Sequence, residues 1–568
     1  MTASPSPPSS APAGWRILPQ GDRCLIVWFG AQIDAGVGRA CLAAAGLLRA
    51  AGLAGVTDVV PSFAAVAVHY RPGPDGAPDY ATLAAQVERL LAGGIPVDDS
   101  AGREMEIPVC YGGEHGPDLE EAARAAGLTP EALVALHGAP GSMVYMLGFA
   151  PGHSYIGVHD ARLDLPRRAT PRTAVPAGSV AIANRQTVIY PARLPGGWNI
   201  IGATPLNLFD PGREPAALLQ PGEPHPLRAD RRRRVRSPAG GAMSLAVIKP
   251  GMLSTFQDGG RHGYQHQGIP VAGAMDPRAH RLANLLAGNA ADTATLEITV
   301  AGPTLRFEAP ACVALGGADL GATLGGLPAP VLRPLVARAG DVLSFARPGQ
   351  GARAYLAVHG GYDLPMVMGN QSTYLRSAFG GYHGRALAKG DQVGLRRPLA
   401  DDAARLDALA QQLWQLRFYL AATLSSPPRD VLRILPGPHW AAFDAASRQA
   451  LLDQAFRIGA QSDRMGYRLE GPRLRLSEPR EMLSEATCFG TVQVPADGAP
   501  IVLMADRQTT GGYPKLAQAM PGQALRFALI ELAQAQRLDA AREAAFAQLT
   551  GQLDALRGLL RDFQEPTP

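Results

Sequence analysis

The segment TCFGTVQVPADGAPIVLMADRQTTGGYP, residues 487–514, predicts two strands with a turn between them. Val492 and Val494 alternate with Gln493, which gives one apolar face and one face that presents an amide. Asp497-Gly498 is a turn dipeptide. The apolar run 501–504 that follows has the length and branching of a buried strand.

A charged and hydroxyl-rich segment follows that buried strand directly, from Ala505 to Tyr513, and contains Gly511-Gly512. Polar loops at the end of a buried strand are common places for a binding site. The same composition also suits a polar β-turn whose glycines supply positive φ angles. The residues alone favour both interpretations equally.

Composition indicates a globular protein of several domains. The chain has 568 residues, of which 46% are hydrophobic and 18% charged, and this length suggests roughly three to four domains. The 65 glycines and 50 prolines suit many short strands and turns. The net charge is only +4, and the basic run 231–236 lies among Pro and Gly without aromatic residues. We therefore expect a solvated linker there and no nucleic-acid partner.

The five cysteines are scattered and form no CxxC pair, so their spacing indicates neither a zinc site nor a disulfide framework. Residues 1–14 predict a disordered Pro/Ser tail, because they lack the charged and apolar regions of a signal peptide. No apolar run reaches the ~18 residues of a membrane helix. We expect a cytoplasmic protein without a membrane contact.

The order of predicted elements gives a β-rich α+β fold class with several domains. In the first domain the pattern β-α-β-β-α predicts a ferredoxin-like sandwich, and the short strands with Gly/Pro turns after it predict a closed barrel. The expected divisions are a tail (1–14), an α+β domain (15–103), a barrel (104–225), an Arg/Pro/Gly linker (226–244), a β-rich domain (245–400), a helical insert (401–428), a second β-rich barrel domain (429–531) and a C-terminal helix and tail (532–568).

A short repetition links the two parts of the chain. Arg185-Gln186-Thr187 and Arg507-Gln508-Thr509 both follow an apolar strand and a small residue. The repetition suggests related barrels that place the same loop for function.

Candidate chemical groups lie in these loops. Arg464 could bind a carboxylate or phosphate, or could pair with Asp463 or Glu470. Asp506 could be a base or metal ligand, or could cap a turn.

Three amides and one imidazole complete this set. Gln186, Gln493 and Gln508 could donate to an oxyanion or a lactam-like carbonyl. His153 could be a general acid–base, although a lone histidine is more often a packed side chain. Asp276 precedes Pro277 and is expected to cap a helix.

Common catalytic motifs are absent from the sequence. It contains no GxxxxGK[ST], GxSxG or HExxH, and no lysine lies in a biotin-attachment context. Any ATP chemistry would therefore use an unconventional pocket or a partner.

Several longer motifs resemble a known family. Gly148 to Gly152, Val175 to Ile182 and Pro195 to Trp198 resemble allophanate hydrolase subunit 1, also called a kinase-inhibitor-like protein. Ser462 to Arg468 and Gln493 to Tyr513 resemble allophanate hydrolase subunit 2. The resemblance covers nearly all of residues 15–530, and the chain looks like a fusion of the two subunits. At two positions it departs from the family pattern: His153 stands where an aromatic residue is expected, and Asn184 where glycine is usual.

The resemblance implies cyclophilin-like barrels, as in the carboxyltransferase part of urea carboxylase. Stand-alone pairs of these subunits are similar to the B and C subunits of ATP-dependent 5-oxoprolinase. That enzyme opens 5-oxo-L-proline to L-glutamate with a separate A subunit, using ATP as a co-substrate with Mg. A biotin-dependent carboxyltransferase acting on urea or a similar amide, with biotin on another chain, is an alternative. Inhibition of a sensor kinase is a second alternative.

Within that resemblance we expect a small-molecule site without a metal ligand set, on a chain that also forms homo-oligomers. Asp506, Gln508 and His153 are the expected catalytic residues, and alanine at Asp506 or Gln508 is expected to abolish activity with little loss of stability. The residues expected to bind substrate or nucleotide are Tyr155, Gln186, Thr187, Tyr190, Arg464, Gln493, Thr509, Thr510, Gly511, Gly512 and Tyr513.

Overall fold

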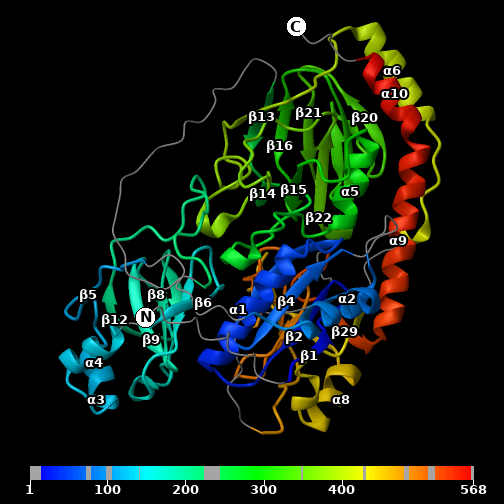
Figure 1. Cartoon of the computed structure of the whole chain (residues 1–568). Coiled ribbons are helices and arrows are strands. Elements are labelled where there is room, and N and C mark those ends of the chain that lie inside the picture. The colour runs from blue at the N-terminus through cyan, green and yellow to red at the C-terminus, as the bar shows by residue number, and fades with distance from the viewer. Residues whose placement is uncertain are drawn as a thin grey trace, which may run out of the picture.

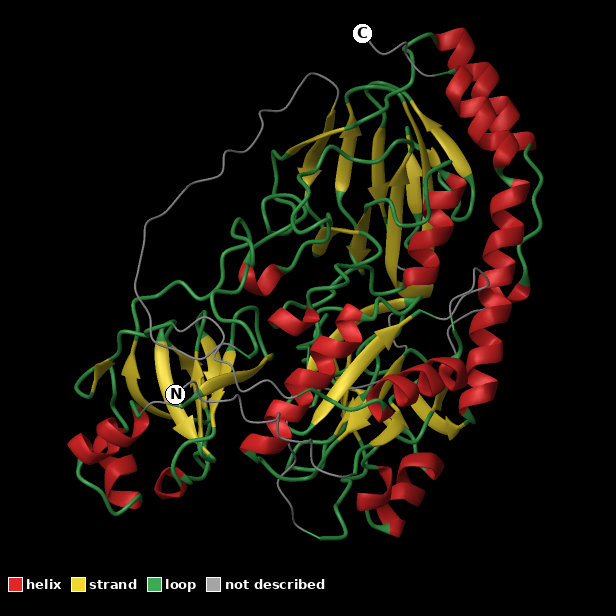
Figure 2. Ribbon diagram, in the orientation of Figure 1, coloured by secondary structure: helices red, strands yellow, loops and turns green. Residues whose placement is uncertain are grey.

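The computed structural model describes residues 14–71, 78–96, 105–139, 141–222, 244–346, 350–425, 430–478, 485–509 and 518–563. Four blocks built around β-sheets are flanked by a long helix at the C-terminal end (Figures 1 and 2). We call residues 14–96 the first block, 105–222 the second, 244–400 the third and 430–530 the fourth. The β-rich, multidomain expectation is confirmed, and the domain boundaries stay predictions.

The first block is one antiparallel sheet with helices on one face. Its strand order is β1-β2-β4-β3. Strand β1 precedes the predicted β-α-β-β-α pattern and pairs with β2. Asp34 caps α1 and Asp79 caps α2, each by accepting backbone N–H groups. The elements are β1 (Arg16–Pro19), β2 (Cys24–Trp28), α1 (Ala35–Ala50), β3 (Val56–Pro61), β4 (Ala65–Tyr70) and α2 (Tyr80–Ala92).

Residues on the two faces of this sheet alternate along each strand. Leu25 and Val27 pack with α1 and α2 on one face. Cys24 and Ile26 face the other way and pack against Ala486 and Cys488 of the fourth block. The first block is therefore buried on both faces, and one of them is covered by the second half of the chain.

The second block contains a six-stranded sheet of order β5-β12-β9-β10-β7-β6 and a small β11-β8 pair. Asn184 and Arg185 both have positive φ and form the two-residue turn between β9 and β10. The family resemblance predicts glycine at position 184, and the φ of 50° there is one that glycine adopts without strain. The elements are β5 (Cys110–Tyr111), α3 (Leu119–Ala125), α4 (Pro130–His137), β6 (Met143–Leu147), β7 (Ser154–Gly157), η1 (Ala161–Leu163), β8 (Arg172–Val175), β9 (Ser179–Ala183), β10 (Gln186–Ile189), β11 (Leu194–Gly196) and β12 (Asn199–Ala203).

The third block packs a six-stranded sheet, β19-β18-β21-β16-β13-β23, against a five-stranded sheet, β14-β15-β22-β17-β20, around one apolar core. Helix α5 covers the outer face of the five-stranded sheet, and Asp276 caps it as expected. The elements are β13 (Ser244–Lys249), β14 (Leu253–Gln257), η2 (Gln265–Gln267), α5 (Pro277–Leu286), β15 (Thr295–Thr299), β16 (Thr304–Phe307), β17 (Ala311–Asp319), β18 (Ala322–Leu324), β19 (Leu327–Pro328), β20 (Pro334–Ala337), β21 (Val342–Phe345), β22 (Gln350–Val358), η3 (Leu375–Ser377) and β23 (Gln392–Gly394).

The fourth block is a six-stranded sheet of order β24-β29-β25-β26-β28-β27, in which β24 and β29 are parallel. The two strands predicted in residues 487–514 are β27 and β28, which pair antiparallel. Helices α6 (Ala403–Gln415) and α7 (Ala422–Ser425) precede the block. Its elements are β24 (Val431–Ile434), η4 (Trp440–Ala442), α8 (Ala445–Asp453), β25 (Phe456–Ile458), β26 (Gly466–Glu470), β27 (Val492–Gln493), β28 (Ile501–Leu503) and β29 (Ala524–Leu529).

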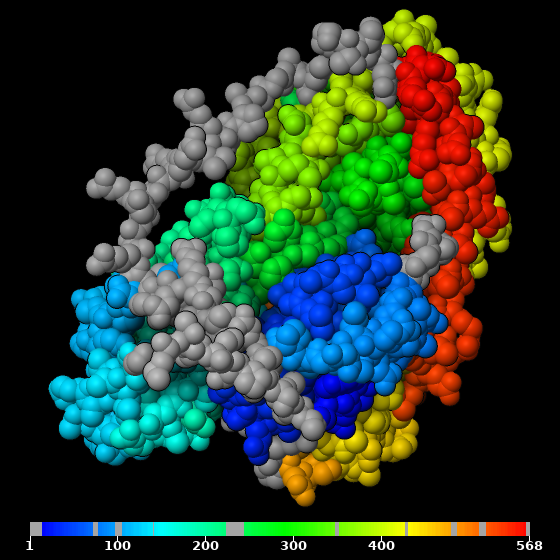
Figure 3. Space-filling model, viewed as in Figure 1, coloured from blue at the N-terminus to red at the C-terminus, as the bar shows by residue number. Residues whose placement is uncertain are grey.

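The C-terminal helices α9 (Leu532–Gln552) and α10 (Asp554–Asp562) run along one side of the molecule. Phe546 and Leu549 pack in the same core as α5 and α6. Arg23 of the first block contacts Asp539 at 2.7 Å, and Arg281 of α5 contacts Glu543 at 2.8 Å. Figure 3 shows the first block, in blue, between the second block, in cyan, and this red helix. No helix in the described part of the chain is both long and apolar enough to cross a bilayer.

Candidate functional site

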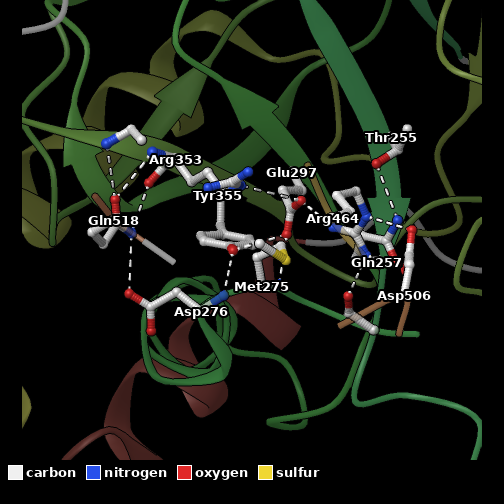
Figure 4. A network of polar contacts seen from close by, with 12 residues as sticks. Thr255, Gln257, Met275, Asp276, Glu297, Arg353, Tyr355, Arg464, Asp506 and Gln518 are labelled. Atoms are coloured by element: carbon white, nitrogen blue, oxygen red, sulfur yellow. Dashed lines mark hydrogen bonds and ion pairs between the residues drawn. The ribbon is translucent and has the colours of Figure 1, made fainter. Parts of the chain in front are cut away.

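A buried ion-pair network lies between the third and fourth blocks, which together form the second half of the chain (Figure 4). Arg464 precedes β26 and Asp506 follows β28, and because these strands are antiparallel neighbours the two side chains meet. Nε and Nη2 of Arg464 donate to the two Asp506 oxygens, each at 2.9 Å. Nη1 donates to Glu297 of β15, and Nη2 also donates to the Gly273 carbonyl at 2.7 Å. The network therefore joins the third and fourth blocks.

Glu297 is the second carboxylate of this network. It accepts the Met275 N–H at 2.8 Å and the Tyr355 hydroxyl at 2.9 Å. Nε of Arg353 lies 3.9 Å from Glu297, and Nη1 of Arg353 donates to the Tyr467 hydroxyl. Two arginines thus face two carboxylates inside the protein, which is the arrangement that buried charges require.

The two carboxylates have pKa values shifted in opposite directions. Burial raises the pKa of Asp506, and the negative charge of Glu297 adds to the increase although Arg464 opposes it. Burial also acts against ionisation of Glu297, but Arg464 and Arg353 together hold the pKa of Glu297 below its ordinary value. Asp506 is therefore the member of the network that accepts a proton more readily.

The structural interpretations raised for these two residues, an ion pair of Arg464 with Asp463 or Glu470 and a turn cap by Asp506, are wrong. Asp463 accepts the N–H groups of Met465 and Gly466 in a turn, and Glu470 makes no ion pair with Arg464 among the described residues. Asp506 is an ion-pair partner of Arg464, and its carboxylate caps no turn in the part of the chain that the structure describes. All three nitrogens of the Arg464 guanidinium donate to protein groups, so Arg464 could offer a substrate carboxylate at most one further N–H, on Nη1, unless a protein group is displaced.

The loop after Asp506 is held by one residue at the start of the 487–514 segment. Thr487 N–H donates to the Thr509 carbonyl at 2.8 Å, and its hydroxyl donates to the Gln508 carbonyl at 3.1 Å. The Gln508 side chain is half-buried, whereas the Thr509 hydroxyl is buried without a partner among the described residues. Gln493 is exposed on β27. Thr510, Gly511, Gly512 and Tyr513 lie outside the described residues.

The predicted site residues of the first half lie in the second block. His153, Tyr155 and Tyr190 meet, with both tyrosine ring centroids 5.1 Å from the imidazole, and Phe149 lies 5.3 Å away. His153 is 2% exposed, and burial lowers its pKa to about 3. Its Nδ1 has no hydrogen-bond partner among the described residues. His153 is thus a neutral ring in an aromatic cluster, which fits the aromatic residue expected at this position.

Thr187 lies between two histidines that the sequence did not single out. Its hydroxyl is 2.7 Å from Nε2 of His137 and 2.7 Å from Nε2 of His159. Burial and the neighbouring His159 lower the pKa of His137 to about 3, and burial and Arg185 lower that of His159 to about 4. Tyr111 and Ser142 contact the outer nitrogens of the two rings. Gln186 is buried next to Thr187 at the start of β10.

The equivalence of the two Arg-Gln-Thr segments is wrong. Arg185 lies in a hairpin turn, and Gln186 and Thr187 begin a strand. Arg507 follows a strand in an irregular loop, 6.0 Å from the Phe489 ring centroid. Among the described residues, no hydrogen bond or ion pair connects His153 with Asp506. The predicted residues therefore form two groups, one in each half.

The two halves also meet through polar groups. Asp58 of β3 accepts the Gln265 N–H at 2.7 Å, and Nδ1 of His266 lies 3.1 Å from it. Although burial opposes ionisation, the hydrogen bond and charge of His266 hold the pKa of Asp58 below its ordinary value. Nearby, Cys24, His69 and Cys488 converge at the face shared by the first and fourth blocks. Sequence spacing gave no signal for this convergence.

Comparison with known families covers both halves. The family described as "Carboxyltransferase domain, subdomain C and D" matches residues 15–219, and "Carboxyltransferase domain, subdomain A and B" matches residues 267–540. The crystal structure of TTHA0988 is 34% identical, with a TM-score of 0.74 over 89% of this chain and 99% of that one.

Named relatives match each half separately. The second half is similar to the C subunit of 5-oxoprolinase from Escherichia coli K12, 40% identical over 54% of this chain and 98% of the relative. The first half is similar to the B subunit of 5-oxoprolinase from Bacillus subtilis 168, 40% identical over 37% of this chain and 90% of the relative. Urea amidolyase of Saccharomyces cerevisiae is 27% identical over 57% of this chain and only 19% of the relative.

These matches define the protein class: the chain belongs to the carboxyltransferase-domain family. Within that family it is a fusion of two halves, which are similar to the B and C subunits of 5-oxoprolinase in that order.

Proposed function

We propose that this chain supplies the B and C parts of an ATP-dependent 5-oxoprolinase, which hydrolyses 5-oxo-L-proline to L-glutamate together with a separate A subunit. One observation carries the proposal: a single chain spans 98% of a relative of the C type and 90% of a relative of the B type. The predicted cytoplasmic location, the small-molecule substrate and a homo-oligomeric assembly belong to the same proposal.

The chemistry needs a carbonyl oxygen made reactive and a water molecule guided to its carbon. In the proposed reaction ATP phosphorylates the lactam oxygen and releases ADP. A first water then attacks the lactam carbon and the ring C–N bond opens to give an acyl phosphate, and a second water hydrolyses this acyl phosphate to L-glutamate and phosphate. Asp506 and Gln508 are the proposed catalytic residues of the second half, where a raised pKa suits Asp506 to proton transfer. His153 is the proposed catalytic residue of the first half.

The buried network also sets a limit on this proposal. All three nitrogens of Arg464 donate to protein groups, which supports a role in orienting Asp506 beside the proposed contact with substrate. Both carboxylates of the network are held by arginines, so the network does not fit Mg²⁺. The remaining proposed binding residues are Tyr155, Gln186, Thr187, Tyr190, Gln493, Thr509, Thr510, Gly511, Gly512 and Tyr513.

We also propose that the first block is ferredoxin-like and that the blocks after it are cyclophilin-like barrels, as the family resemblance implies. The four-stranded antiparallel sheet with two helices on one face supports the first description.

A second candidate function is carboxyl transfer from biotin to urea or a similar amide. The carboxyltransferase-domain matches over both halves favour it. Biotin would then be carried by another chain, because no biotin-attachment context occurs in this sequence.

ADP release with 5-oxo-L-proline, measured with and without a candidate A subunit, distinguishes the two functions. If ADP and glutamate form only when both 5-oxo-L-proline and the A subunit are present, the result would support the three-part oxoprolinase. Carboxyl transfer from carboxybiotin to an amide, without lactam turnover in the mixture, would replace it with the second function.

A further inference from the structure

Three metal-binding side chains converge where the first block meets the fourth. Cys24 of β2 and His69 of β4 are direct partners across the two strands, so their side chains leave the same face of the sheet. Cys488 approaches that face from the fourth block. The two sulfur atoms and one ring nitrogen all lie within 4.8 Å of one another.

We propose that Cys24, His69 and Cys488 bind one Zn²⁺ ion and that this ion joins the two halves of the chain. Sulfur and imidazole nitrogen are the donors that Zn²⁺ prefers. Tetrahedral Zn²⁺ places neighbouring sulfur and nitrogen donors about 3.5 Å apart, as follows from its usual bond lengths. The Cys488 sulfur and Nδ1 of His69 are 3.8 Å apart in this structure.

The surroundings of the three side chains support a structural metal site. Cys24 is fully buried, and Cys488 and His69 are 5% and 6% exposed. Two thiolates neutralise a divalent cation, so the occupied site adds no net charge to an apolar shell that contains Ile26, Val60 and Ala67. Oε1 of Gln20 lies 3.5 Å from the Cys24 sulfur and is placed to serve as a fourth donor.

The contact at the other ring nitrogen of His69, Nε2, also suits a histidine that binds a metal through Nδ1. Nε2 of Gln265 lies 3.4 Å from Nε2 of His69. Turning the Gln265 amide over places its oxygen there, so that His69 donates from Nε2 and leaves Nδ1 free for the cation. A ligating histidine commonly donates its other N–H to an oxygen in this way.

The position of the site links it to the predicted catalytic loop. Cys488 directly follows Thr487, which holds the carbonyls of Gln508 and Thr509. A cation bound at Cys488 would fix this segment against the first block. The site itself rests on the three ligands, and its test is independent of the proposed 5-oxoprolinase activity.

Cobalt binding by the full, tag-free chain tests the site. The protein is stripped with a chelator under a thiol-free reductant and titrated with Co²⁺, whose thiolate complexes absorb in the near ultraviolet and visible. We expect about one equivalent of Co²⁺ to give these bands, Zn²⁺ to abolish them by competition, and Zn²⁺ to raise the unfolding temperature.

Variants of the ligands distinguish this site from adventitious binding. Cys488→Ala and His69→Gln should weaken Co²⁺ binding at least tenfold, while Cys110→Ser, at an exposed cysteine elsewhere, should bind like the parent. A cooperative unfolding transition, measured without metal, shows that a variant is folded. Absence of the bands in folded, reduced parent protein would overturn the proposal, as would unchanged binding by folded Cys488→Ala. A Cys24–Cys488 disulfide in air, with no cobalt binding after reduction, would replace the metal site with a redox pair.

Discussion

The Arg464 guanidinium donates two parallel hydrogen bonds to the Asp506 carboxylate, from Nε and Nη2, and each is 2.9 Å long. Its remaining nitrogen donates to Glu297, on a strand of a different block. Paired donation of this kind fixes both the distance and the plane of the carboxylate. Asp506 therefore combines a fixed orientation with a raised pKa, which are the two properties that a proton-transferring group needs.

Replacing Asp506 should affect both activity and stability. Asp506→Ala leaves the Arg464 charge partly unpaired inside the protein, and losing one partner of a buried pair costs about 3–5 kcal/mol. This corrects the expectation of little loss of stability, because Asp506 is not a solvated loop residue. Urea unfolding measures the cost, with Asp497→Ala at an exposed turn as the control. Equal stability of both variants would contradict a buried ion pair.

Gln508 should behave differently from its neighbour. The Gln508 contact to Thr487 uses the backbone carbonyl, so Gln508→Ala keeps it. We expect loss of activity of about 100-fold or more, if the amide stabilises the reacting oxygen, with an unfolding temperature like that of the parent. ADP release in the presence of the A subunit is the measurement, and Gln411→Ala on α6 is the matched control. Full activity of the Gln508 variant would remove this side chain from the site.

The buried His153 predicts acid sensitivity. Its folded pKa of about 3 lies below the ordinary value near 6.5, so its contribution to stability is complete above pH 6.5. That contribution is lost as the pH falls from about 6.5 toward about 3, at about 1.4 kcal/mol per pH unit. His153→Phe keeps a ring in the cluster of Phe149, Tyr155 and Tyr190 and should flatten this decline. Urea unfolding at pH 7 and pH 5 compares the two proteins, and parallel declines would contradict the assignment.

The hydroxyl shared by His137 and His159 should matter for folding. Thr187→Val keeps the shape of the side chain but leaves two buried imidazole nitrogens without their partner. A lost partner for a buried polar group costs about 1–3 kcal/mol. Thr304→Val, at a half-buried strand position in the third block, is the control. Chemical unfolding of both variants should show a lower free energy of unfolding only for the variant at position 187.

Local sequence patterns predicted the strands of residues 487–514 and the cap at Asp276, because alternation and capping depend on neighbouring residues. The partners of Arg464 were not predictable in this way. Glu297 lies in an apolar strand distant in sequence, and only the packing of two sheets brings it to Arg464. The same holds for Cys24, His69 and Cys488, since no spacing rule applies to ligands from separate blocks.

The contact between Asp58 and residues Gln265 and His266 has a consequence for assembly. If the two halves were separate polypeptides, such a contact would form by collision, and dilution would break it. On one polypeptide the two faces meet in an intramolecular step, so their contact does not depend on the protein concentration. The fused chain thus fixes a one-to-one ratio of its halves. It also keeps them paired at low protein concentrations, at which two separate polypeptides would dissociate.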